Sequence, residues 1–166
     1  MTPHAIFTAA IAEATTAAAA FTALDNFVSA LVPVKLLTIS ITDMEAGLAR
    51  RAYSSNTDAY PVSGTKKINP DAWFRRIHDE RKLYVENDVV TNDREHFFDY
   101  ALIESLGCAA AMNLPVVLGG TVVGTVNILA AKDSYTPEIA ALFAEQAPVP
   151  AMLAYQIALN DKTLLT

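Results

Sequence analysis

The sequence GCAAAMNLPVVLGGTVVGTVNILAAKDSYTPE, residues 107–138, contains two apolar runs that flank a Gly-Gly pair, and each run includes one asparagine. Adjacent glycines tolerate the positive φ angles of a tight turn, so residues 108–117 and 122–130 are predicted to form a β-hairpin. A two-residue turn would send Asn113 and Asn127 to opposite faces, whereas a three-residue loop or a bulge would set them side by side. Because an unpaired buried amide is costly, each asparagine needs a partner in backbone, water or ligand.

Helical patterns lie at both ends of the chain. Residues 1–32 are rich in alanine and are predicted to form one long amphipathic helix. Its apolar stripe recurs every seven residues, at Phe7, Ala14, Phe21 and Val28. A Thr-Pro step gives a cap followed by proline at the first helical position, so a second helix is predicted over residues 136–160. Pro148 and Pro150 predict a break in that helix near residues 148–150.

Residues 34–130 are predicted to hold the sheet and the segments around a pocket. The alternation in KLLTISITD, residues 35–43, predicts a strand that pairs with residues 47–55. Residues 56–69 read as a long loop, which is typical of a lid or binding loop. The elements expected between this loop and the final hairpin are a helix opened by Asn69-Pro70, a strand at 82–88 and a helix at 93–106.

Composition limits the class of protein. The 166 residues are 52% hydrophobic and 18% charged, which is typical of one globular domain over residues 1–166. The net charge of −6 argues against nucleic acid as a partner, because phosphate backbones are bound by clustered Lys and Arg. Residues 50–82 nevertheless hold eight basic side chains against four acidic ones. This segment would either receive an anionic small molecule or form a solvated face with ion pairs.

The sequence also predicts a cytoplasmic protein. The single cysteine, Cys108, excludes an internal disulfide and a cysteine-cluster metal site, which indicates a reducing compartment. The first thirty residues lack Lys and Arg, so a secretory signal is not expected. No run reaches the ~20 apolar residues of a membrane span. The histidines lack metal-pair spacing and are expected to be isolated surface residues, so neither a metal nor a cofactor is predicted.

The hairpin LPVVLGGTVVGTVNIL, ahead of a helix opened by YTPE, resembles the GAF family of small-molecule sensor domains. The shared features are Leu114-Pro115-Val116, the Gly-Gly turn and Gly124-Thr125 before an apolar strand. The resemblance covers nearly the whole chain. It implies an α+β fold, in which a central antiparallel sheet packs the N- and C-terminal helices on one face. Loops and short helices would enclose a pocket on the other face, with residues 56–88 lying over it.

Branches of this family with recognisable chemistry differ from the sequence. Bilin-binding members attach the chromophore to a cysteine commonly followed by histidine, whereas Ala109 follows Cys108. Members that reduce free methionine sulfoxide need more than one cysteine to form and resolve a sulfenic acid. Cyclic-nucleotide-binding members often carry an Asn-Lys-Phe-Asp type motif, which is missing here. The resemblance therefore implies none of these ligands, and no catalytic residue is assigned.

The residues predicted to bind a ligand are aromatic side chains of the pocket segments, the two hairpin asparagines and the cysteine. The aromatic side chains would either stack on a ligand or fill the core. The asparagines would either bind a ligand or form hydrogen bonds with the local backbone. The thiol of Cys108 would be either buried and inert or reactive. The set is Tyr53, Tyr60, Trp73, Phe74, Phe97, Tyr100, Cys108, Asn113 and Asn127.

The predicted function is a sensor that binds an unknown small organic or anionic molecule in an apolar pocket and signals through helix packing. One alternative is a small enzyme that uses Cys108 in the manner of a methionine sulfoxide reductase. The other alternative is a structural dimerisation module that binds no ligand. The stripe on the first helix would pack on the sheet and the last helix, or in part against a second subunit. The family resemblance favours a homodimer formed through the terminal helices.

Overall fold

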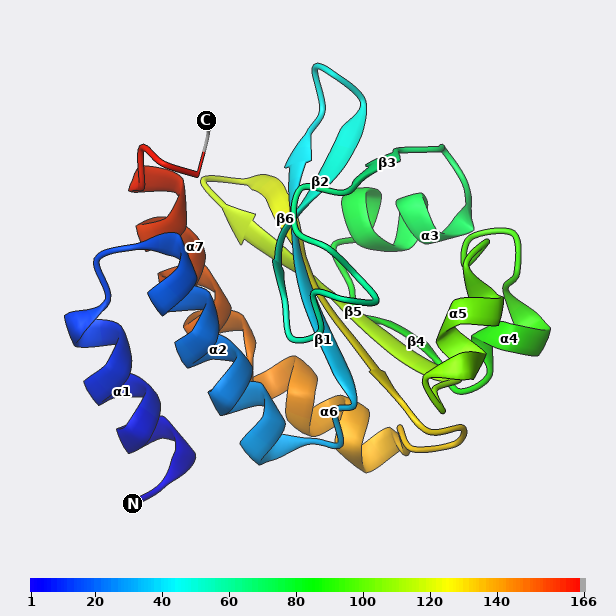
Figure 1. Cartoon of the computed structure of the whole chain (residues 1–166), viewed down its shortest axis with the longest axis horizontal. Helices are drawn as coiled ribbons and strands as arrows, with labels where there is room; N and C mark the ends of the chain where they lie inside the picture. The colour runs from blue at the N-terminus through cyan, green and yellow to red at the C-terminus, as the bar shows by residue number, and fades with distance from the viewer. Residues whose placement is uncertain (165–166) are drawn as a thin grey trace.

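In the computed structural model, which describes residues 1–164, six strands form one antiparallel sheet in the order β3-β2-β1-β6-β5-β4 (Figure 1). The strands are β1 (Leu36–Asp43), β2 (Leu48–Ser54), β3 (Thr65–Lys67), β4 (Tyr84–Glu86), β5 (Ala110–Leu118) and β6 (Thr121–Ala130). One face carries the terminal helices α1 (Pro3–Glu13), α2 (Ala17–Leu31), α6 (Pro137–Gln146) and α7 (Pro148–Asn160). The other carries the short helices α3 (Ala72–Phe74), α4 (Val89–Asn92) and α5 (Tyr100–Ser105), with the π-helix η1 (Arg75–Asp79) continuing α3. The predicted α+β fold is confirmed.

The β5–β6 hairpin has a bulge that decides its register. The two turn glycines have φ angles of 56° and 78°, as a tight turn requires. Between Val116 and Val117 the pairing shifts by one residue. Asn113 therefore pairs with Asn127, and the two asparagines lie on the same face of the sheet. Of the two registers that the sequence leaves open, the bulged one is present.

A second bulge lies in β2. Ile39 pairs with Tyr53 whereas the next residue of β1, Ser40, pairs with Arg51, so Ala52 is the extra residue. Alternation alone would put Arg51 and Tyr53 on one face, because they are two residues apart. The bulge sends Tyr53 toward the terminal helices and Arg51 toward the opposite face.

The main core lies between the sheet and the terminal helices. Phe21 and Leu24 of α2 are fully buried, and they belong to one apolar cluster with Ile39 of β1 and Met112 of β5. A second apolar cluster, which includes the buried Ile103, lies beneath the short helices on the other face. Both faces of the sheet are therefore covered, and the polar residues of the second face lie between the sheet and the segments that cover it.

Tyr155 joins α7 to the sheet through a contact that requires a glycine. Its hydroxyl donates to the carbonyl oxygen of Ser40 at 2.6 Å and lies 3.2 Å from the carbonyl oxygen of Thr125. A Cβ atom on Gly124 would lie 1.9 Å from the Ser40 oxygen and 2.6 Å from the Tyr155 hydroxyl. The Gly-Thr step of β6 thus has a packing reason, because only a residue without a side chain fits there.

The prediction of one continuous helix over residues 1–32 is wrong. The chain breaks between α1 and α2, and α1 lies back along α2 (Figure 1). Thr16 has an extended backbone, and its hydroxyl accepts a hydrogen bond from Ala19 N at 3.2 Å. The carboxylate of Asp161 accepts another from Ala17 N at 2.8 Å. Threonine is a better helix cap than an interior residue, so the second helix starts afresh at this position.

Two expectations for the segment before α3 are corrected. The loop predicted over residues 56–69 contains the edge strand β3, which pairs with β2. The helix that follows is capped by Asp71 rather than by Asn69, because the Asp71 carboxylate accepts from Phe74 N at 2.8 Å. A carboxylate is as good a cap as an asparagine, and the local sequence offers both.

The helix predicted over residues 93–106 forms only in its second half. Helix α4 ends at Asn92, and α5 begins at Tyr100. Between them Phe97 N donates to the carbonyl oxygen of Asp93 at 2.9 Å in an isolated turn. Short polar side chains compete with a regular helix in such a segment. Gly107, with φ of 72°, follows the end of α5 in the expected left-handed conformation.

The C-terminal helices begin where their caps and prolines predict. Thr136 accepts from Ile139 N at 3.3 Å at the start of α6. Helix α6 ends at Gln146 and α7 starts at Pro148. Among residues 1–164, no helix has both the length and the apolar composition to cross a bilayer.

Replacement of Gly124 by alanine should destabilise the protein by about 3 kcal/mol or more, because the new methyl group must displace a strand carbonyl and a buried tyrosine. Urea unfolding of the variant and the wild type measures the difference. Thr121→Ala, at an exposed position of the same strand, is the control and should cost no more than about 1 kcal/mol. Equal unfolding midpoints for the two variants would contradict the packing role assigned to Gly124.

Candidate functional site

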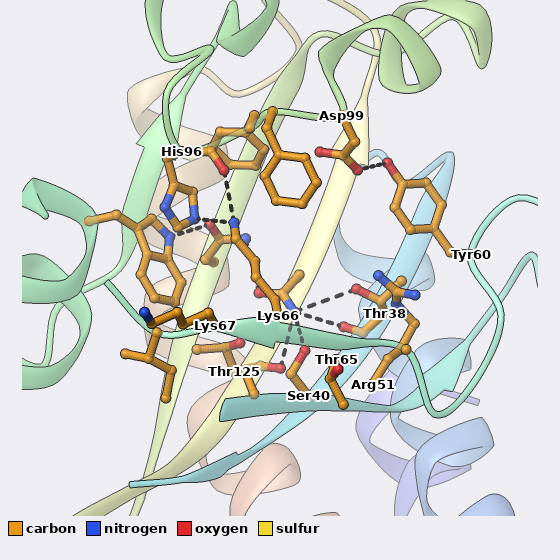
Figure 2. Close-up of a pocket in the computed structure, with 18 of the residues that line it drawn as sticks. Thr38, Ser40, Arg51, Tyr60, Thr65, Lys66, Lys67, His96, Asp99 and Thr125 are labelled. Carbon is orange, nitrogen blue, oxygen red and sulfur yellow. Dashed lines mark hydrogen bonds between the residues drawn. The ribbon is translucent and has the colours of Figure 1, made fainter. Parts of the chain in front are cut away.

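A cavity of about 190 Å³, lined by both apolar and polar side chains, lies on the sheet face opposite the terminal helices (Figure 2). Its floor is made of side chains from three central strands. They are the apolar Leu36 and Leu129 and the polar Thr38, Ser40, Asn113, Thr125 and Asn127. Its walls come from β2, β3 and the loops and short helices over that face, and include Arg51, Tyr60, Lys66, Lys67, Asp71, Trp73, His96, Phe97 and Asp99. The segment expected to lie over the pocket thus contributes part of the wall.

A chain of hydrogen bonds runs from the wall into the floor. The indole nitrogen of Trp73 donates to Asn113 Oδ1 at 2.8 Å, and Asn113 Nδ2 donates to Asn127 Oδ1 at 3.0 Å. An indole N–H can only donate, so Asn113 must present its oxygen to Trp73 and its amino group to Asn127. The same reasoning orients Asn127, whose amino group must point away from Asn113 toward the oxygens of β1 and β6.

The amino group of Asn127 is held by long contacts only. Its Nδ2 atom lies 3.4–3.5 Å from four oxygens of Thr38, Ser40 and Thr125, as Figure 2 shows with dashed lines. Typical N–H···O bonds are about 2.9–3.0 Å long, so these contacts are weak. A ligand oxygen in the cavity could therefore take a shorter bond from Asn127 without breaking a strong one.

A second chain of polar groups joins Lys66, His96 and Asp71. Lys66 Nζ lies 2.8 Å from the carbonyl oxygen of His96 and 3.2 Å from its Nε2, while His96 Nδ1 lies 3.0 Å from Asp71 Oδ2. An ammonium can only donate, so Nε2 accepts and Nδ1–H donates to the carboxylate. Burial, and then the charge of Lys66, lowers the pKa of His96, which favours this neutral imidazole. Burial also lowers the pKa of Lys66.

The remaining wall combines a guanidinium, a phenol and a carboxylate. Arg51 lies over the ring of Tyr60, 4.9 Å from its centre, and donates to the carbonyl oxygen of Pro61 at 3.0 Å. The Tyr60 hydroxyl donates to the Asp99 carboxylate, and burial, followed by this hydrogen bond, raises the pKa of Tyr60. With His96 neutral, the cationic groups Arg51, Lys66 and Lys67 outnumber the two carboxylates of the lining.

The structure brings five of the nine predicted ligand-binding residues to this cavity, namely Tyr60, Trp73, Phe97, Asn113 and Asn127. Tyr53 lies on the helix face, where its hydroxyl donates to Asp25 at 2.7 Å. Phe74 stacks on His78 at 4.6 Å between ring centres, and Tyr100 lies under Arg94 at 4.5 Å. These three aromatic residues are engaged elsewhere and do not belong to the lining.

Cys108 is also outside the cavity lining. It is 3% exposed and belongs to the apolar cluster beneath the short helices. Burial raises the pKa of its thiol, which disfavours the nucleophilic thiolate. Within residues 1–164 no group of three His, Cys, Asp or Glu side chains is arranged to hold a metal ion.

The sequence analysis missed His96 and the hydroxyl groups of the floor. His96 was expected at the surface, but its side chain is 12% exposed and stacks on Trp73 with ring centres 4.5 Å apart. The alternation of Thr38 and Ser40 with apolar residues in β1 was a signal for a polar second face. No comparable local signal marks His96, because its partners lie 25 and 30 residues away.

No family model and no curated protein matches the sequence. Solved structures do match. The GAF domain/HD domain protein from Geobacter sulfurreducens superposes with a TM-score of 0.67 at 14% identity, over 83% of this chain and 91% of that chain. The GAF domain of a two-component sensor histidine kinase from Bacillus halodurans gives 0.65 at 12% identity, over 82% and 91%. The chain has a GAF-like fold.

A third GAF-like match is an enzyme. The type II free methionine-R-sulfoxide reductase from Thermoplasma acidophilum has a TM-score of 0.55 at 15% identity, over 75% of this chain and 80% of that chain. A domain of a sensor histidine kinase and a reductase thus share this fold at similarly low identity. The function of this GAF-like chain has to be argued from its own cavity.

Acidification should weaken the fold through His96. Its lowered pKa means that the unfolded chain, with an ordinary histidine pKa of about 6.5, binds a proton at a higher pH than the folded chain. The free energy of unfolding therefore falls as the pH decreases below about 6.5, toward the lower pKa of the folded state. We expect His96→Gln to lose less stability than the wild type between about pH 7.5 and 5.5, as measured by urea unfolding.

His78 remains in that variant and leaves some pH dependence, because burial lowers its pKa as well. The variant His78→Gln is therefore measured in the same way, so that the contributions of the two imidazoles to the pH dependence of stability can be separated. If His96→Gln and the wild type lost equal stability on acidification, the neutral state assigned to His96 would be wrong.

Proposed function

We propose that this GAF-like domain is a sensor that binds a small organic anion in the cavity. The observation that carries the proposal is the excess of cationic side chains over carboxylates around one cavity. Arg51, Lys66 and Lys67 line the cavity, and the weakly held amino group of Asn127 forms part of its floor. Charge-assisted hydrogen bonds from such groups are the ordinary means of holding a carboxylate or a phosphate.

The size of the cavity restricts the ligand. A dry cavity of about 150 Å³ in another protein takes up benzene, so 190 Å³ corresponds to a single ring or a short-chain acid. The cavity opens to solvent, so this volume limits the part of a ligand that the lining surrounds. The stacked pair of Trp73 and His96 supplies a flat apolar wall beside the polar floor.

The same features weigh against both alternatives. An enzyme that uses Cys108 would need an accessible thiolate. This thiol is buried, it lies outside the cavity lining, and its pKa is raised. A module without a ligand would fill the space with its own apolar side chains. A cavity lined by lysine, arginine, hydroxyl and amide groups favours a ligand-binding role instead.

Tyr155 offers a route from the cavity to the helices. Ser40 and Thr125 contribute to the floor, and their carbonyl oxygens are the two atoms that the Tyr155 hydroxyl contacts from α7. A ligand that moves either strand would change this contact and therefore the packing of α7. This supports signalling through helix packing as part of the proposal.

The homodimer and the cytoplasmic location stay predictions. Phe7, Phe21 and Val28 of the predicted stripe are buried within the chain itself, so a dimer would use other residues. The exposed apolar side chains of α7 include Val149 and Leu153, which are 64% and 47% exposed. We propose this part of the helical face for contact with a second copy.

Arg51→Gln should weaken the binding of a small carboxylate by about 10-fold or more, because it removes one charged donor from the cavity. Trp73 is the single tryptophan of the chain and lines the cavity, so its fluorescence reports binding directly. The titration uses acetate, pyruvate, succinate, benzoate and inorganic phosphate, with thermal shift as a second readout.

The matched control is Arg50→Gln, which removes the same charge one residue away. Arg50 points to the helix side, where it donates to the carbonyl oxygen of Leu164. We expect it to leave the affinity unchanged. If none of the five anions binds the wild type, or if both arginine variants weaken binding equally, an anion site in this cavity is excluded.

A further inference from the structure

We propose that Lys66 captures a small carboxylic acid that bears a carbonyl group, such as a 2-oxo acid, by forming a reversible imine with its side-chain amine. This rests on the proposed function of the same cavity and names its ligand class. The observations behind it are the position of Lys66 in the cavity wall, its contact with His96, and the presence of Arg51 and Asn127 as donors in the same lining. Figure 2 shows the Lys66 amine next to His96.

Lys66, His96 and Asp71 have the geometry of an activated nucleophile. The amine lies 3.2 Å from Nε2 of the imidazole, and Nδ1 lies 3.0 Å from the carboxylate that orients the ring. A nucleophile within reach of a base, with the base held by a third group, is the arrangement that lets side chains attack carbonyl carbon. The donor-only ammonium forces Nε2 to carry the lone pair that this role needs.

Burial of Lys66 lowers the cost of removing a proton from its ammonium group. Its side chain is half-buried, whereas the rings of Phe97 and Phe98, 5.9 and 5.3 Å from the nitrogen, attract the ammonium form. Burial lowers the pKa of this amine, although Asp71, Asp93 and Asp99 act in the opposite direction. A desolvated lysine of this kind is a better nucleophile at neutral pH than an exposed one.

The proposed step conserves atoms and electrons. His96 Nε2 accepts a proton from the ammonium of Lys66, the freed amine forms a C–N bond to the carbonyl carbon, and the imidazolium returns this proton to the carbonyl oxygen. His96 then takes a second proton from the nitrogen and passes it to the resulting hydroxyl. The nitrogen lone pair forms the C=N bond while the C–O bond breaks, and the oxygen leaves as water with both protons. Hydrolysis reverses the sequence, so neither an oxidant nor a reductant is needed.

The product matches the groups around it. A protonated imine keeps one N–H, which can donate to the carbonyl oxygen of His96 that Lys66 already contacts at 2.8 Å. The carboxylate of the acid would meet the donors of Arg51 and Asn127 elsewhere in the lining. A carbonyl acid therefore uses both sides of the cavity, whereas a simple aldehyde would use one.

The test is reductive trapping of the wild-type protein with glyoxylate or pyruvate and sodium cyanoborohydride at neutral pH. Intact mass gives the number of adducts, and peptide mapping assigns them to lysines and to the N-terminal amine. We expect Lys66 to be modified at least ~10-fold faster than any other amine, because base catalysis contributes rate factors of this size or more. Equal rates at all amines would overturn the proposal without the need for any variant.

Two variants and two carbonyl-free acids complete the test. Lys66→Arg should remove the fast adduct, whereas Lys82→Arg, at an exposed lysine outside the cavity, should keep it. His96→Gln should slow trapping by ~10-fold or more and change its pH profile. If glycolate and lactate bind in the fluorescence titration but the carbonyl acids give no adduct at Lys66, the imine is wrong and the anion site stands. If none of these acids binds, the proposed imine and the proposed anion site are both wrong.

Discussion

The cavity depends on one extra residue in β6. Next to the turn, Val117 pairs with Val122, but beyond the bulge Val116 pairs with Gly124, which makes Val123 the extra residue. Side chains alternate along a strand, so a shift of one residue moves every later side chain to the other face. Asn127 thereby joins the face of Asn113. Without the shift, one of the two amides would point into the apolar core between the sheet and the terminal helices, where burial of an unpaired amide is costly.

Features of the fold that depend on neighbouring residues could be predicted from the sequence. The Gly-Gly turn, the threonine cap before α6 and the prolines of α7 each act within a few residues, and the structure places each as expected. The break at Thr16 was missed because the apolar spacing continues across it, and because part of its stabilisation comes from the distant Asp161. The side of the sheet that Tyr53 occupies was missed for a similar reason, since nothing in its surrounding residues marks the bulge at Ala52.

The candidate site was predictable only where its residues carried their own signal. Asparagines in an apolar hairpin demand partners, and an indole near the pocket segment is a natural wall, so Asn113, Asn127 and Trp73 were found. His96 lies in a polar stretch that reads as solvated surface, and Lys66 lies in the basic segment for which the sequence left an anion site and a solvated face open. They become a pair only because β3 adds to the edge of the sheet and the turn before α5 folds over it. Tertiary packing, rather than local pattern, creates this half of the site.

The two halves of the cavity differ in how tightly the protein holds its own polar groups. On the floor, the amino group of Asn127 has contacts of 3.4–3.5 Å, so a ligand oxygen can replace them with a net gain. On the wall, Lys66 has a contact of 2.8 Å with the His96 carbonyl, which a ligand anion would have to break in order to bind the ammonium. A simple ion pair at Lys66 therefore gains less than its charge suggests. A covalent bond to the same nitrogen avoids this cost, since it leaves one N–H in place for the carbonyl. The floor is thus suited to non-covalent recognition and the wall to bond formation, although both halves face the same small space.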